Sequence, residues 1–249
     1  MSPTIYPDRP TPPPINPPPE PIVPAVEIEE EEWESPFPEK PKRATDTVAY
    51  RGATSDPTFG YLIAIALCIG LTPLIPENPD LRYTLLWTVM AGFGVLSWLL
   101  GNSARIWTDT PENLGWGVIF GLIISVPLLI VGGTTLRQTD QKLFIGMGVG
   151  EVLAYLIFVM PLAETLFFRG VIQEIRAFWV VGILSSIWSI LLFFPLLEVN
   201  KFPAVALVVG TALVMMNVIY SYVRQRNGLA AAWVCQIVVN LVLLFLPFL

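Results

Sequence analysis

The chain has 249 residues, of which 54% are hydrophobic and only 14% are charged. Soluble globular domains carry about 25% charged residues, so the composition argues against an ordinary soluble protein. The net charge of −6 excludes the basic surface of a nucleic-acid-binding protein. With two Cys and no His, the chain lacks the residues for a disulfide framework, for a zinc site built on His or Cys clusters, and for any mechanism that needs an imidazole.

Residues 1–58 are predicted to form a Pro-rich acidic arm. Residues 1–59 hold 15 of the 24 Pro, with 11 acidic and 5 basic residues, so the whole net charge lies in this segment. Such a segment cannot bury enough apolar surface to fold, and we expect disorder with polyproline II stretches. It is either a solvated spacer or a docking arm for a protein partner, because Pro-rich runs fit aromatic grooves and the acidic run 29–32 suits a basic surface. Its first residues do not have the pattern of a secretory signal peptide.

Residues 59–249 are predicted to form an all-α domain, a polytopic bundle of about seven transmembrane helices in a lipid bilayer. Apolar stretches near the ~20 residues that span a bilayer recur along this part. The expected spans are 59–76, 83–100, 115–133, 143–162, 178–198, 202–222 and 229–249. Polar residues crowd around 164–176, after the fourth span, and the last three spans could instead be tilted or partly re-entrant.

The distribution of basic residues predicts the orientation. With the N-terminus in the cytoplasm, nine basic residues near the spans lie inside and four lie outside, as the positive-inside rule requires. The inside set is Lys40, Lys42, Arg43, Arg51, Arg105, Arg169, Arg176, Arg224 and Arg226, and the outside set is Arg82, Arg137, Lys142 and Lys201. The odd number of spans then places Leu249 on the outer side.

Small residues recur at helical spacing. Gly117 and Gly121 form one such pair, and Gly146 and Gly150 form another. We expect close helix packing at both. The two Cys fall inside predicted spans and are expected to be buried apolar residues.

Polar residues at bilayer depth are costly and indicate function by default. The candidates are Glu151, Glu164, Arg169, Gln236 and Asn240. Gln236 and Asn240 are four residues apart and share a helix face. Glu151 and Glu164 lie about 20 Å apart along a helix, too far for a catalytic pair. On an ideal helix Arg169 lies about 140° around from Glu164, so their contact would need a bent helix, for which Pro161 is a candidate cause.

Two interpretations of these polar residues stay open from the residues alone. In one, Glu164 is a general base toward water, and Gln236 and Asn240 donate hydrogen bonds to a developing oxyanion. In the other, the same groups join helices through interhelical hydrogen bonds.

The segment 161–170 resembles the first motif of the CAAX protease and bacteriocin-processing family of intramembrane endopeptidases, E-E-x-x-x-R. Glu164 matches the first Glu, Thr165 stands in the place of the second, and Arg169 matches the Arg. The last span resembles the third motif, H-x-x-x-N, with Gln236 in the His position and Asn240 matching the Asn.

The second family motif, F-x-x-x-H, is expected between residues 185 and 198. Phe193 would place Leu197 at the His position, and Phe194 would place Glu198 there. Neither register supplies a His, so both motif His and one Glu are missing.

The resemblance implies a CAAX-protease-like membrane protein, and the missing groups imply impaired catalysis. A Gln cannot shuttle a proton, and losing one positioned acid–base group typically costs 10²–10⁴-fold in rate. The sequence therefore favours a pseudoprotease that binds or scaffolds a membrane protein or peptide, without metal or cofactor.

The alternative is a working peptidase in which Glu164 activates water, Gln236 and Asn240 bind the oxyanion and Arg169 orients Glu164 or the substrate. A transporter is a lesser alternative, supported by Glu151 alone. The short loops and the resemblance suggest a bacterial inner membrane.

Overall fold

The structure is a computed structural model that describes residues 57–75, 78–99, 110–197 and 201–249. Residues 1–56 of the predicted N-terminal arm and the candidate Glu198 lie outside these residues. Throughout the described part the regular elements are helices, and none of the described residues is in a strand.

Seven long helical segments follow one another in the described part of the chain. They are α1 (Pro57–Leu74), α2 (Pro79–Leu99), α3 (Pro111–Leu143), the composite helix Val149–Ile175, α7 (Phe178–Phe193) with the 3₁₀ turn η5 (Phe194–Leu196), α8 (Pro203–Asn227), and the last helix, Leu229–Phe248. The composite helix consists of α4 (Val149–Ala154), η3 (Tyr155–Val159), α5 (Met160–Glu164), η4 (Thr165–Ile172) and α6 (Gln173–Ile175). The last helix consists of α9 (Leu229–Asn240), η6 (Leu241–Phe245) and α10 (Leu246–Phe248).

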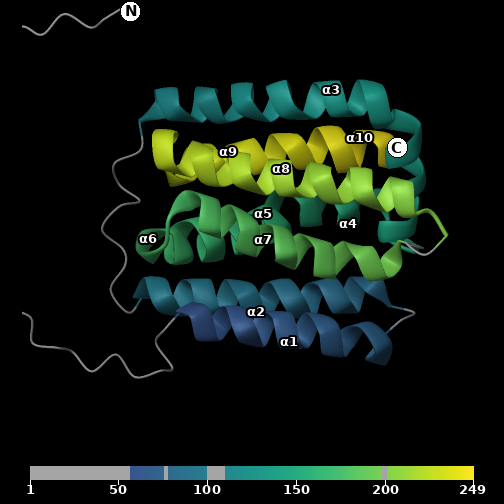
Figure 1. Cartoon of the computed structure of the whole chain (residues 1–249), viewed down its shortest axis with the longest axis horizontal. Coiled ribbons are helices and arrows are strands. Elements are labelled where there is room, and N and C mark those ends of the chain that lie inside the picture. Colours follow the sequence, from purple (N-terminus) through teal and green to yellow (C-terminus); the bar gives the residue numbers. More distant parts are fainter. Residues whose placement is uncertain (1–56, 76–77, 100–109, 198–200) are drawn as a thin grey trace, which may run out of the picture. The chain divides into compact units, whose positions relative to one another are not determined.

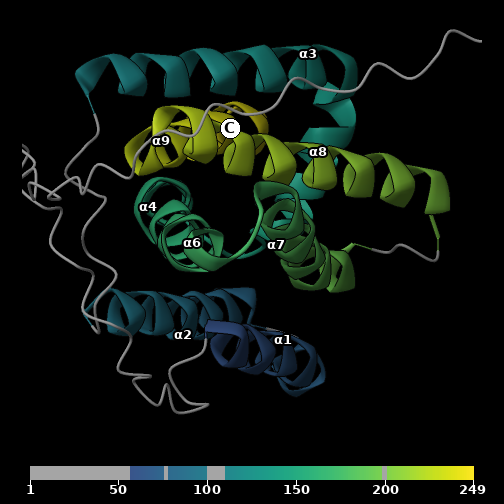
Figure 2. The same cartoon turned by 60° about the vertical axis from the view of Figure 1, so that its left-hand side comes forward.

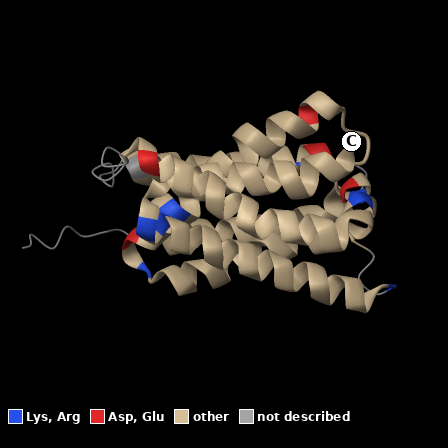
Figure 3. Cartoon of the chain, turned by 90° about the horizontal axis from the view of Figure 1, so that it is seen from above, with Lys and Arg blue, Asp and Glu red and all other residues tan. Residues whose placement is uncertain are grey.

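The predicted membrane-spanning bundle is confirmed. Among the described residues, six of the seven helices are long and apolar enough to cross a bilayer, and α2 is a further helix of comparable length. Charged residues gather at the two ends of the bundle, and the ribbon between them is almost free of charge (Figure 3). The chain is an integral membrane protein whose outer helix faces contact lipid.

Two predicted boundaries are wrong. The third span was expected to end at residue 133, but α3 continues to Leu143; the fourth was expected to end at residue 162, but the composite helix continues to Ile175. Polar side chains do not end the composite helix there, because Glu164, Thr165 and Arg169 point into the bundle, where they are 3% exposed or less.

The helices pack in layers that place the composite helix at the centre. In Figures 1 and 2, α1 and α2 form one layer, the composite helix and α7 the next, α8 and α9 the third, and α3 covers α9 on the outside. The composite helix contacts α2 on one side and α9 on the other. Its side chains therefore lie where α2, α7 and α9 can all reach them.

One of the two glycine pairs is a helix contact. A Cβ on Gly117 would lie 2.4 Å from the Ala231 carbonyl oxygen of α9, and one on Gly121 would lie 2.8 Å from Val238. This confirms close packing of α3 on α9. The expectation for Gly146 and Gly150 is wrong: both are exposed, a Cβ on either would meet nothing within 4 Å, and Gly146 instead forms a turn with a φ of +79°.

The two Cys side chains are buried and free, as expected, at 0% exposure each. The predicted orientation depends on five basic residues outside the described part of the chain. The described basic residues divide equally between the two sets, four in each.

Candidate functional site

Glu164 lies at the centre of the bundle and its carboxylate is held by three side chains from three other helices. Trp87 of α2 and Trp188 of α7 donate their indole N–H groups to Oε1, at 3.2 and 3.1 Å. Gln236 of α9 donates from Nε2 to Oε2 at 2.6 Å. The carboxylate is 1% exposed, so these donors replace the water that an ionised or polar group would otherwise need.

Gln236 is itself held in one orientation by Thr165. The Thr165 hydroxyl donates to Gln236 Oε1 at 2.9 Å, which turns the Gln236 amide nitrogen toward Glu164. The residue at the second-Glu position and the residue at the His position therefore contact each other. Glu164, Thr165 and Gln236 thus lie together in the bundle.

Arg169 is not paired with Glu164 by a hydrogen bond. Its Nη2 donates to Asn217 Oδ1 of α8 at 2.8 Å, and Asn217 in turn donates to the Ser189 hydroxyl at 3.0 Å. The guanidinium lies over the rings of Phe168 and Tyr220, with centroid distances of 5.7 and 5.3 Å. Its Nε and Nη1 have no hydrogen-bond partner among the described residues. Cation–π contacts therefore supply part of its stabilisation.

Near this site the composite helix contains π-helical turns, which have more residues per turn than an α-helix. The segment Thr165–Ile172 is π-helical, as is Tyr155–Val159 ahead of Pro161. In a π-helix residues five apart are hydrogen-bonded neighbours, so Arg169 lies nearer to the face of Glu164 than the 140° of an ideal α-helix allows. Such π-helical turns are frequent at functional sites, and here they change the relative direction of the Glu164 and Arg169 side chains without joining them by a hydrogen bond.

Asn240 belongs to the same helix as Gln236 but has a different contact. Its amide nitrogen donates to the Leu156 carbonyl oxygen at 3.2 Å and lies 3.6 Å from Met160 Sδ. This bond joins α9 to the π-helical turn η3, where the i→i−4 pattern is interrupted. The structure thus places Asn240 beside the composite helix without a hydrogen bond to Glu164.

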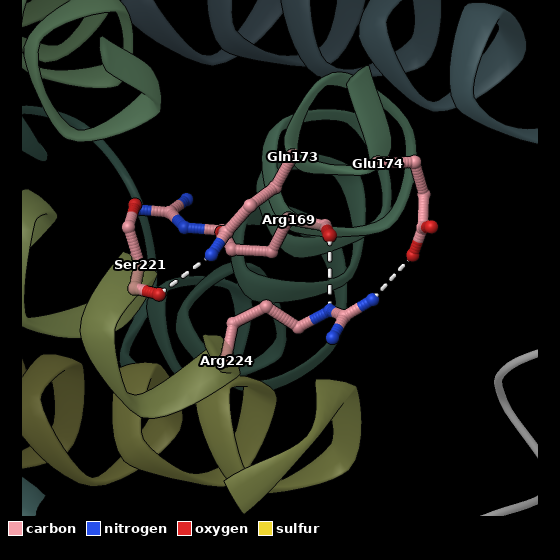
Figure 4. A network of polar contacts seen from close by, with 5 residues as sticks. All are labelled: Arg169, Gln173, Glu174, Ser221 and Arg224. Atoms are coloured by element: carbon pink, nitrogen blue, oxygen red, sulfur yellow. Dashed lines mark hydrogen bonds and ion pairs between the residues drawn. The ribbon is translucent and has the colours of Figure 1, made fainter. Parts of the chain in front are cut away.

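A second polar network joins the C-terminal part of the composite helix to α8 (Figure 4). Arg224 of α8 donates from Nε to the Arg169 carbonyl oxygen at 3.1 Å and pairs through Nη2 with Glu174 at 2.5 Å. Gln173 donates to the Ser221 carbonyl oxygen at 2.7 Å. These contacts tie η4 and α6 to α8 and thereby fix the backbone that carries Arg169.

The second-motif window contributes Trp188 to the site, and Phe193 and Leu197 of the first proposed register line the same cavity as Glu164. Leu197 follows the last turn η5, and Glu198 lies outside the described residues. Trp188, nine residues before Leu197, is the side chain of α7 that hydrogen-bonds Glu164. Ser189 next to it reaches Asn217.

Glu151 has a local structural role. The composite helix begins at Val149, so Glu151 lies in its first turn, is exposed, and accepts a hydrogen bond from the Gly148 backbone N–H at 2.8 Å. A carboxylate in this place satisfies an otherwise unpaired N–H and interacts favourably with the helix dipole. The expectation that Glu151 is an acid at bilayer depth is therefore wrong. The transporter interpretation rested on this residue alone and has lost that support.

A cavity of about 380 Å³ lies against the site. Glu164, Gln236 and Asn240 line one part of it, with Ser189 and Asn217. The rest of the wall is formed mainly by apolar side chains of α3, α8 and η6. Its volume is at the low end of the range of about 300–1,000 Å³ for small-molecule pockets.

Part of the chain matches the model of a known protein family. Residues 149–242 match the family model described as type II CAAX prenyl endopeptidase Rce1-like. The match confirms the CAAX-protease-like resemblance. It covers about two fifths of the chain, and Glu164, Arg169, Gln236 and Asn240 all lie inside it. Neither the curated proteins nor the solved structures give a match to the chain.

The donor set of this CAAX-protease-like site does not suit a divalent metal ion. Glu164 already accepts three hydrogen bonds, and its polar neighbours are an amide, a hydroxyl and two indoles, which are poor zinc ligands. Within the described residues, no group of three or more His, Cys, Asp or Glu side chains could hold a metal ion. What the arrangement can do is hold a buried carboxylate in one rotamer beside an apolar cavity.

Three residues of the site were missed from the sequence. Trp87 and Trp188 look like ordinary apolar span residues, and nothing in their spacing distinguishes them. Asn217 could have been found, because it is an amide inside the predicted span 202–222, as Gln236 and Asn240 are in theirs.

Proposed function

We propose that this CAAX-protease-like membrane protein has lost efficient peptidase activity and acts by binding another membrane protein or a membrane peptide. The observation that carries the proposal is the state of Glu164. Its carboxylate accepts hydrogen bonds from Trp87, Trp188 and Gln236 and is 1% exposed. A group that is to activate water needs that water within hydrogen-bond reach, and here protein donors take three of the about four acceptor sites of the carboxylate.

The neighbours of Glu164 support the same conclusion. Thr165 and Gln236 can exchange hydrogen bonds but cannot carry a proton at neutral pH. Asn240 directs its amide to the Leu156 carbonyl, so it is committed to a helix contact. Among the described residues, the side chains hydrogen-bonded to the Glu164 carboxylate are two indoles and one amide, and none of these is an acid–base group at neutral pH.

A binding role needs a surface for the partner, and two parts of the chain offer one. The apolar cavity beside Glu164 accepts a hydrophobic group from the bilayer. The Pro-rich acidic arm, residues 1–58, offers a docking segment for a basic or aromatic-lined protein partner on the cytoplasmic side.

The alternative, a working intramembrane peptidase, is favoured by one observation. Glu164 and Gln236 both line the cavity, and Oε2 accepts a hydrogen bond from Gln236 while a carboxylate oxygen can accept two. A water bound there would contact Glu164 as general base. Gln236 and Asn240 would then serve the oxyanion, with Arg169 as a positioning residue.

Proteolysis by reconstituted protein separates the two functions. Wild type, Glu164→Ala and Gln236→His proteins are placed in liposomes with a pool of quenched fluorogenic transmembrane peptides. We expect wild type to release no more fluorescence than Glu164→Ala, while circular dichroism shows both folded. Cleavage by wild type that disappears in Glu164→Ala would establish the peptidase and refute the pseudoprotease.

The binding role makes its own prediction with the same proteins in cells. Glu164→Gln is expected to retain the partners recovered by in-membrane cross-linking, because the carboxylate does no chemistry. Deletion of residues 1–58 is expected to lose them. The reverse result, loss in Glu164→Gln and retention after the deletion, would contradict a scaffold that uses the arm.

A further inference from the structure

A second carboxylate lines the cavity, well separated in sequence from Glu164. Asp140 lines it from the last turn of α3. Most of the cavity wall between Asp140 and Glu164 is apolar. On this wall, Val131 of α3 is 88% exposed and Val208 of α8 is 67% exposed. Exposed apolar side chains on a membrane-spanning bundle face lipid, so the cavity adjoins the bilayer between these two helices.

Asp140 is a carboxylate without a partner. It is 0% exposed, and neither Oδ1 nor Oδ2 has a hydrogen-bond partner among the described residues. The nearest basic residues on the same helix, Arg137 and Lys142, are exposed side chains, whereas Asp140 is turned inward. Removing a carboxylate from water without a compensating donor is costly, and buried polar groups in native proteins are nearly always satisfied. A ligand that brings a donor to Asp140 would remove this cost.

We propose that the cavity binds a single-chain lipophilic primary amine, with its apolar chain along the wall and its ammonium group on Asp140. Charge complementarity selects the head group, because an ammonium offers three donors and the opposite charge to two unpaired carboxylate oxygens. The cavity volume of about 380 Å³ suits one short chain rather than a two-chain lipid. A fatty acid fits less well, because its carboxylate would lie against the Asp140 carboxylate.

The position of Asp140 matches how such an amphiphile lies in a bilayer. Asp140 is near the end of α3, where the bundle's charges gather, so the head group lies toward the membrane surface and the chain toward the centre. A smaller cavity of about 140 Å³ shares Thr135 and Thr139 with the larger one and is lined by Gln138 and Lys142. The proposal does not depend on whether Glu164 cleaves peptides.

Photo-cross-linking with competition tests this. Full-length protein in nanodiscs whose lipid is phosphatidylcholine, which has no primary amine, is labelled with a diazirine-bearing alkylamine, and the labelled peptides are mapped by mass spectrometry. We expect labels on α3 and α8, and we expect dodecylamine to compete at least about tenfold better than dodecanol, as a charge-assisted contact implies. Equal competition by the amine and the alcohol, or labelling confined to other helices, would overturn the proposal.

Variants show whether Asp140 and the cavity are responsible. Asp140→Asn should remove the preference for the amine, Asp140→Glu should keep most of it, and Glu112→Gln, which removes an exposed carboxylate from the other end of α3, should not change it. Ala212→Phe fills the cavity without altering Asp140, so it should abolish labelling even if Asp140→Asn does not fold. Retained preference in Asp140→Asn, or unchanged labelling in Ala212→Phe, contradicts the site. Competition by a Lys-bearing transmembrane peptide but not by dodecylamine would assign the cavity to a peptide instead.

Discussion

The indole of Trp188 donates a hydrogen bond to Glu164 Oε1 across 3.1 Å, which joins α7 to the centre of the composite helix. Both side chains are essentially inaccessible, at 0% and 1% exposure. The contact combines a large buried aromatic surface with a donor aimed at a carboxylate. It makes α7 part of the site although α7 contributes no acid or base there.

Trp188→Phe tests how much that donor contributes. The substitution keeps an aromatic ring but leaves Glu164 with one donor fewer in a water-free place, so we expect the free energy of unfolding to fall by about 1.5–3 kcal/mol. Thermal or denaturant unfolding in detergent measures this. Trp179→Phe is the matched control, because Trp179 is 56% exposed, and it should leave stability nearly unchanged. Equal effects in the two variants would contradict a stabilising hydrogen bond from Trp188 to Glu164.

Exchanging the groups of Glu164 and Gln236 tests their complementarity. In Glu164→Gln, the two Trp donors keep the carbonyl oxygen of the new Gln at the position of Oε1, and Thr165 keeps Gln236 in its orientation. The amide nitrogen of the new Gln would therefore face the amide nitrogen of Gln236. In Gln236→Glu two carboxyl groups would meet. Each single variant should be destabilised.

The double variant Glu164→Gln/Gln236→Glu restores one donor facing one acceptor, and the carboxylate introduced by Gln236→Glu can still accept from Thr165. We expect a favourable coupling energy of about 0.5–3 kcal/mol from a double-mutant cycle of unfolding free energies. Additive destabilisation of the two changes would argue that Gln236 and Glu164 are not directly bonded.

The close approach of α3 to α9 predicts opposite effects of the same substitution at two glycines. Gly117→Ala would bring a Cβ to 2.4 Å from the Ala231 carbonyl oxygen, so the helices must separate and stability should fall by 1 kcal/mol or more, roughly the cost of overpacking. Gly115→Ala meets nothing within 4 Å and should stabilise α3 by up to about 1 kcal/mol through helix propensity. Melting temperatures of the two variants should therefore move in opposite directions.

The network at Arg224 predicts unequal effects of its two bonds. The side chains of Arg224 and Glu174 are 16% and 21% exposed, so Glu174→Gln should cost about 1 kcal/mol or less and depend on salt. Arg224→Gln also removes the bond to the Arg169 carbonyl, in a π-helical segment where backbone bonds are irregular. It should destabilise more, and hydrogen exchange should accelerate in residues 165–175. Similar exchange in both variants would contradict a role of Arg224 in holding this backbone.

The seven helices were predictable because a bilayer imposes a local rule. About 20 consecutive apolar residues must form a helix whatever their neighbours, and turn residues such as Asn227 and Gly228 mark where one helix ends. The sequence also singled out Glu164, Thr165 and Gln236 through their motif positions, but the contacts among them come from the structure. The close pair Gly117 and Gly121 followed from the same rule of small residues at a membrane helix interface.

What the tertiary structure decided is the partner of each polar side chain. Gly146 and Gly150 have the spacing of a helix interface but lie at a turn, and Glu151 caps a helix that begins two residues before it. The positions of Asp140, Trp87 and Trp188 at the cavity or on Glu164 depend on how α2, α3 and α7 are rotated and how far they extend. Hydropathy is a property of each segment alone, whereas a hydrogen bond between helices requires the register and rotation of two segments, which only their packing in three dimensions determines.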